Sequence, residues 1–189
     1  MKKAFIIVSI LCMGCQYKSA QKQEIINEEI QVILNTFEIA VTAVTENDFE
    51  DLKAEIKNIP YKKVNRTHKY TVKDSLLSMD RFKFSHYEKK GKHIKETVGY
   101  DYKKFLGIKK YSFKILEIDM KIAESDRDYN GHLTFSRVVF NEQRNRARYY
   151  FEQSKLIGVG RGWGMGVYIY AKKVNGIWVF DKEEDVWIA

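Results

Sequence analysis

A run of acidic and amide side chains between residues 126 and 131 has the spacing of a calcium-binding loop. Asp126, Asp128 and Asn130 stand at alternate positions, and Gly131 follows them directly. Alternating oxygen ligands can converge on one hard cation, and the glycine permits the sharp turn that such a loop needs. A complete loop then adds a bidentate glutamate, but this chain has Arg137 at that position. We therefore interpret the segment as a polar turn, for which these residue types are typical, and expect no metal.

A second candidate is the segment from Gly158 to Gly166, in which glycine occupies every second position. This spacing does not match a phosphate-binding loop, and no helix is expected after it to supply an N-terminal dipole. Alternating glycines are typical of a strand that bends or bulges. The alternative is a ligand contact at the rim of the sheet, in which Arg161 and Trp163 supply a cation and an aromatic surface.

Residues suited to catalysis are present, but no known catalytic pattern is. The sequence has no nucleophile elbow and no zinc-protease motif. The four histidines share no metal-binding spacing; they are His68, His86, His93 and His132. The acidic residues near the C-terminus favour a solvated turn; they are Asp181, Glu183, Glu184 and Asp185. We therefore predict no catalytic residue, no cofactor and a non-enzymatic protein.

The first fifteen residues carry the features of an export signal. Lys2 and Lys3 precede an apolar run over residues 4–13. That run is shorter than the roughly 20 residues that a membrane-spanning helix needs, so it is typical of a secretory signal. Gly14 and Cys15 follow it, and this junction resembles the lipobox of bacterial lipoproteins. The resemblance implies that the chain is cleaved before Cys15 and that this cysteine carries the lipid.

The resemblance implies a signal peptide at 1–14 and a lipidated tether at 15–23. Length and the absence of a composition break predict a single domain at 24–189. The lipobox resemblance also implies a membrane-anchored lipoprotein of the bacterial cell envelope, held by acyl chains without a transmembrane helix. An ordinary export signal or an uncleaved N-terminal anchor is the alternative. Cys12 is a poor lipidation site, because the bulky Leu11 precedes it.

Composition sets further limits. The chain has 189 residues, a formal charge of +8 and 44% hydrophobic residues, which suffices for a real core. Both cysteines lie in the first fifteen residues, so the folded body contains no disulfide. The basic charges are scattered, and we expect a membrane anchor and no nucleic-acid partner.

The hydrophobic pattern predicts an α+β fold, with N-terminal amphipathic helices packed on an antiparallel meander sheet of four or more strands. Apolar spacings of three and four predict a helix over 24–46, and a second helix is expected at 47–59 before Pro60. A short helix is expected at 101–106. Strands are expected at 69–72, 80–87, 112–122, 133–140, 146–154, 167–174, 177–180 and 185–188. The pair Asn175-Gly176 predicts a tight hairpin between two of them.

The C-terminal third resembles a class of exported bacterial proteins. The string Phe135-Ser-Arg-Val-Val-Phe-Asn141, the run Lys173-Val-Asn-Gly-Ile-Trp-Val179 and the closing Trp187-Ile188 follow the pattern SRVxFN…GxYxxxKxNGxW…WI. This resemblance indicates a shared fold, but it assigns no activity. Helices followed by a curved sheet are also similar to cystatin-like and NTF2-like folds.

These features predict a non-enzymatic envelope lipoprotein with a protein-binding or structural role, whose partner is an unknown envelope protein. The alternative is a module that binds a small molecule or a glycan between the helix and the sheet. Cys15 is the predicted lipidation site, and Arg161 and Trp163 are the candidate ligand contacts; no other residue is assigned a role.

Overall fold

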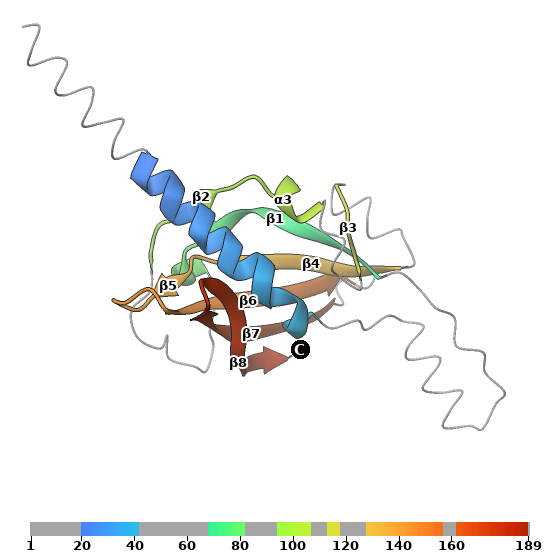
Figure 1. Ribbon diagram of the computed structural model, residues 1–189. Helices are drawn as coiled ribbons and strands as arrows, with labels where there is room; N and C mark the ends of the chain where they lie inside the picture. Colours follow the sequence, from blue (N-terminus) through green and yellow to red (C-terminus); the bar gives the residue numbers. More distant parts are fainter. Residues whose placement is uncertain are drawn as a thin grey trace, which may run out of the picture.

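The computed structural model describes residues 20–41, 68–81, 94–106, 113–117, 128–156 and 162–188. The signal peptide, Cys15, the second predicted helix, Asp126 and Arg161 lie outside these segments. So do most of the strand expected at 80–87 and the second half of the strand expected at 112–122. The fold is α+β, with one N-terminal helix packed on a mixed, mostly antiparallel sheet (Figure 1).

The N-terminal helix spans residues 20–36 and tightens into a 3-10 turn, η1 (Phe37–Ala40). Its apolar stripe is buried as predicted, with Ile30, Ile33 and Phe37 at most 1% exposed. Residues 20–23, expected in the tether, are already helical. The predicted end at residue 46 is wrong, because Val41 has extended backbone angles and ends the helix.

Eight strands form the sheet of the described segments. They are β1 (Lys69–Leu77), β2 (Val98–Gly99), β3 (Lys114–Ile115), β4 (Tyr129–Ser136), β5 (Val139–Phe140), β6 (Arg146–Leu156), β7 (Gly162–Val174) and β8 (Ile177–Ile188). The order is β2-β1-β4-β6-β7-β8, with β3 beside β1 and β5 beside β6. The predicted antiparallel meander is confirmed for β4-β6-β7-β8. It fails at β1, which runs parallel to β3 and β4, because a long connection lets a strand return in the same direction.

The hairpin between β7 and β8 is confirmed at Asn175 and Gly176. Their φ angles are 50° and 80°, the left-handed values that a tight two-residue hairpin turn needs. The turn at 141–145 is also confirmed, and α3 (Lys103–Leu106) lies within the expected helix at 101–106.

Three predicted strands are shorter or interrupted. Asp80 and Arg81, expected in a strand, belong to a 3-10 turn, η2 (Met79–Arg81). After β3, residues 116–117 are not part of a strand. The strand expected at 133–140 is divided into β4 and β5, because the backbone between them leaves the ladder. Val138 N donates to Glu29 Oε2 at 3.0 Å there, in place of a strand partner.

The main core lies between the helix and one face of the sheet, and it is rich in aromatic rings. Phe37 contacts the rings of Phe105, Phe113 and Phe135, with centroids 5.4–5.9 Å apart. Figure 1 shows the helix, in blue, crossing this face of the sheet. Tyr150, Tyr168 and Val186 form a second, smaller cluster apart from this core.

Candidate functional site

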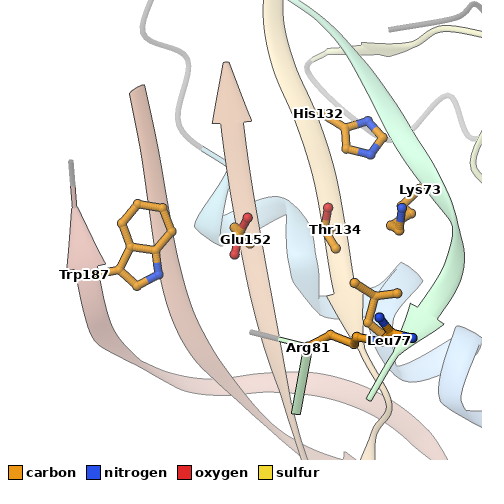
Figure 2. A pocket seen from close by; sticks show the side chains of 7 residues that line it. All are labelled: Lys73, Leu77, Arg81, His132, Thr134, Glu152 and Trp187. Atoms are coloured by element: carbon orange, nitrogen blue, oxygen red, sulfur yellow. The ribbon is translucent and has the colours of Figure 1, made fainter. Parts of the chain in front are cut away.

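An open surface pocket of about 410 Å³, called the cavity below, lies on the face of the sheet opposite the helix (Figure 2). It is lined by Lys73, Leu77, Arg81, His132, Thr134, Glu152 and Trp187. Strand geometry explains why these residues lie on one face of the sheet, because successive side chains of a strand point to opposite faces. Leu133 and Phe135 of β4 are fully buried in the helix-side core, so His132 and Thr134 point the other way.

The strand register brings three of these residues into one row across the sheet. Thr134 of β4 is opposite Glu152 of β6, Glu152 is opposite Gly166 of β7, and Gly166 is opposite Trp187 of β8. Side chains opposite one another on adjacent strands are near neighbours. The row therefore places a hydroxyl, a carboxyl and an indole side by side, with a glycine between the last two.

The glycines of β7 make room for the indole. A Cβ at Gly166 would lie 1.8 Å from the Tyr150 hydroxyl and 2.4 Å from Trp187 Nε1, and one at Gly164 would lie 2.7 Å from Trp187 Cη2. The Trp187 ring therefore covers the bare backbone of this strand, and its Nε1 donates to the Tyr150 hydroxyl at 2.5 Å. Burial raises the pKa of Tyr150, so this hydroxyl stays protonated near neutral pH.

His132 is held in a fixed orientation on the cavity wall. Its Nδ1 is 2.9 Å from Thr71 Oγ1, and that hydroxyl is 2.8 Å from the Tyr129 hydroxyl. Burial, helped by the positive charge of Lys73, lowers the pKa of His132 from 6.5 to about 4. The imidazole is therefore neutral at pH 7, and it can hydrogen-bond a ligand without adding charge.

Three charged side chains line the cavity, and none of them is in an ion pair with any residue that the structure describes. Lys73 and Arg81 are basic, and Glu152 is acidic. Burial raises the pKa of the Glu152 carboxyl above its ordinary 4.5. Elsewhere the partly buried Glu28 and the fully buried Glu29 each pair with basic side chains. A cavity with unpaired charges and a fixed aromatic ring has the features of a small-molecule site.

The calcium-loop residues that the structure describes do not form a turn at Asn130 and Gly131. Both lie inside β4, where Gly131 has a φ of 118° and β4 carries one more residue than β1 between paired positions. This is a β-bulge. Asn130 is fully buried and its Nδ2 is 2.6 Å from His68 Nδ1, while the Asp128 carboxylate is 3.5 Å from Lys69 Nζ.

The remaining predicted residues are not brought to the cavity. Trp163 is partly buried against the helix-side core, on the opposite face from Trp187, and Arg161 and Cys15 lie outside the described segments. The acidic residues expected in a turn lie within β8, where Asp181 pairs with Lys172 at 2.9 Å. In the described part of the chain, no three metal-ligating side chains are grouped.

Sequence reasoning missed the residues that line the cavity, because they come from β1, η2, β4, β6 and β8. One signal was available for part of the site. The glycines at 162, 164 and 166 occupy alternate positions, so within a strand they lie on the same face and leave that face of the sheet without side chains. This alternation indicates which face of the sheet carries the pocket, but it does not identify the side chains around it.

Comparisons of the chain with models of known protein families, with curated proteins and with solved structures find no match. Within the described segments, no helix has both the length and the apolar character needed to cross a membrane.

Proposed function

We propose that this protein is a non-enzymatic lipoprotein of the bacterial cell envelope, anchored through Cys15, whose α+β domain binds a small polar molecule. The observation that supports the binding role is the cavity on the free face of the sheet, where Lys73, Arg81 and Glu152 lie without ion-pair partners among the described residues. Lys73 and Glu152 are partly buried, and unpaired charge that is partly withdrawn from water is costly. A ligand that supplies the missing partners would remove that cost.

The cavity changes the place where a ligand is expected. The sequence suggested a ligand between the helix and the sheet, but that space holds the aromatic core around Phe37 and Phe135. The opposite face has the hollow, the hydrogen-bonding groups and the exposed part of the Trp187 ring. A cystatin-like arrangement, in which one helix precedes and crosses an antiparallel sheet, remains our proposal for the finer fold.

A protein-binding role is the second candidate, and it is supported by the edge strand β8. This strand is twelve residues long and ends the strand order within the described segments. Ile177 and Ile188, near its two ends, are 62% and 69% exposed. An exposed strand edge can pair with an extended segment of another protein.

The anchor is tested by metabolic labelling with a radioactive fatty acid. We expect label on the wild-type protein and on Cys12→Ser, and none on Cys15→Ser, which should leave the membrane fraction or accumulate as a precursor. Label retained by Cys15→Ser would contradict the lipoprotein proposal.

The binding role is tested by ¹⁹F NMR of protein labelled with fluorotryptophan. The Trp187 resonance is assigned with Trp187→Phe, and a library of small polar metabolites is added in pools. We expect one chemical class to shift the Trp187 signal and to leave Trp163 and Trp178, which face the core, unchanged. If no compound shifts Trp187, the cavity is not a binding site and the edge-strand role becomes the better proposal.

A further inference from the structure

The cavity has two chemically different ends. Figure 2 shows Lys73, Leu77 and Arg81 on the β1 side and Trp187 on the β8 side, with Thr134 and Glu152 between them. Its volume, about 410 Å³, is at the small end of the roughly 300–1,000 Å³ range of small-molecule sites. A ligand that uses the whole cavity must therefore be small and must carry different groups at its two ends.

The β1 end is suited to an anion. Lys73 and Arg81 add two positive charges, and neither has an ion-pair partner in the described part of the chain. Glu152 removes at most one of these charges, and His132 is neutral at pH 7, so the lining keeps a net positive charge. Arginine binds a carboxylate through two parallel hydrogen bonds, and lysine adds a point charge.

The middle of the cavity is suited to hydroxyl groups. Thr134 donates and accepts hydrogen bonds, the Glu152 carboxyl accepts them, and the free ring nitrogen of a neutral His132 does one or the other. A ligand with several hydroxyls can satisfy all three side chains without adding charge.

The β8 end is suited to a flat or weakly apolar surface. The Trp187 ring is fixed from two directions, by the hydrogen bond from its Nε1 to the Tyr150 hydroxyl and by the backbone of Gly164 and Gly166 beneath it. A ring held in this way loses little conformational entropy when a ligand packs on it. The carbon-bound hydrogens of a sugar ring form such a surface.

From these three features together we infer that the cavity binds a polyhydroxylated carboxylate of monosaccharide size, such as a hexuronic acid. The inference rests on the proposed binding function and names its ligand class. The carboxylate lies between Lys73 and Arg81, the hydroxyls contact Thr134, Glu152 and His132, and the sugar ring packs on Trp187. A neutral sugar leaves both cations unpaired, and a small anion without a ring leaves the indole uncovered.

The experiment is isothermal titration calorimetry of the mature full-length protein in detergent at pH 6. The probes are glucuronate, methyl glucoside, acetate and inorganic phosphate. We expect glucuronate to bind at least tenfold more tightly than each of the other three. Equal affinity for methyl glucoside, or for acetate or phosphate, would overturn the acidic-sugar assignment.

Variants locate the binding groups. Lys73→Met and Arg81→Gln should each weaken glucuronate about tenfold, the scale of a lost charge-assisted hydrogen bond, and Trp187→Leu should weaken it about fivefold. The matched controls are Lys104→Met, at an exposed position of α3, and Trp163→Leu, on the other face of the sheet. Circular dichroism confirms that each variant is folded. If the control variants weaken glucuronate binding as much as the cavity variants do, the assignment is wrong.

The two proposals fail in different ways. If the fluorotryptophan screen finds a ligand at Trp187 but glucuronate does not bind, the binding function stands and the acidic-sugar inference is wrong. If neither experiment finds a ligand, both are wrong.

Discussion

The buried ion pair between the helix and the sheet gives the sharpest stability prediction. Glu29 is fully buried and Arg137 is 5% exposed. The pair is bidentate, with Arg137 Nη2 2.7 Å from Glu29 Oε1 and Arg137 Nε 2.8 Å from Glu29 Oε2. Burial alone would lower the pKa of Arg137, but the hydrogen bonds and charge of Glu29 reverse this and raise it.

Removal of Arg137 leaves the Glu29 carboxylate buried and unpaired, which costs about 3–5 kcal/mol. We therefore expect Arg137→Met to lower the free energy of unfolding by that amount. Glu29→Leu should cost a similar amount. Val138 N loses its acceptor, which costs about 1–3 kcal/mol, but Arg137 keeps a longer ion pair with Glu96 at 3.8 Å.

The double variant Glu29→Leu with Arg137→Met removes both charges and keeps the space filled. It should cost several kcal/mol less than the sum of the single variants, because replacing a whole buried pair by apolar groups is often neutral. The difference is the coupling energy between the two side chains.

Urea unfolding followed by circular dichroism measures all three variants. The control is Lys103→Met, which breaks an exposed ion pair with Glu117 at 3.1 Å and should leave the urea midpoint unchanged. A cost below about 1 kcal/mol for Arg137→Met, or additive single costs, would refute the argument that these charges are desolvated together.

Three further predictions concern the core, the cavity and pH. Phe37→Ala should cost about 3–5 kcal/mol in urea unfolding, because its ring is fully buried among other aromatic rings; a cost below about 1 kcal/mol would show that the helix is not packed on the sheet. Gly166→Ala should displace Trp187 and shift its tryptophan fluorescence, since the added Cβ overlaps the indole. The control Gly99→Ala should leave the fluorescence unchanged, because its Cβ would meet only one atom, at 4.0 Å. The pKa of His132 is about 4 in the folded protein and 6.5 ordinarily, so the unfolded chain binds the proton more tightly. The free energy of unfolding should therefore fall by about 2–3 kcal/mol as the pH drops from 7 to 4. An unchanged pH dependence in His132→Gln would contradict this.

The local sequence predicted the elements whose signals are contained within a few residues. The spacing of Ile30, Ile33 and Phe37 marks the buried helix face, and Asn175-Gly176 fixes a hairpin because both residues adopt positive φ. At Gly131 the sequence predicts a turn and the structure has a bulge, since asparagine and glycine favour both structures and only the pairing partners distinguish them. Gly131 faces Ser154 so closely that a Cβ would lie 2.4 Å from its carbonyl oxygen.

By itself, then, the sequence determined the α+β class, the buried helix stripe, the C-terminal meander and the tight turn. Each depends on residue type at short range, where backbone geometry and apolar periodicity act. Only the tertiary structure decided that β1 runs parallel to β4, that Arg137 pairs with Glu29, and that Lys73, Arg81, His132 and Trp187 surround one cavity. These arrangements bring together residues up to 114 positions apart in the sequence, such as Lys73 and Trp187 at the two ends of the cavity. Strand direction and register select them, and neither is determined by the composition of a single strand.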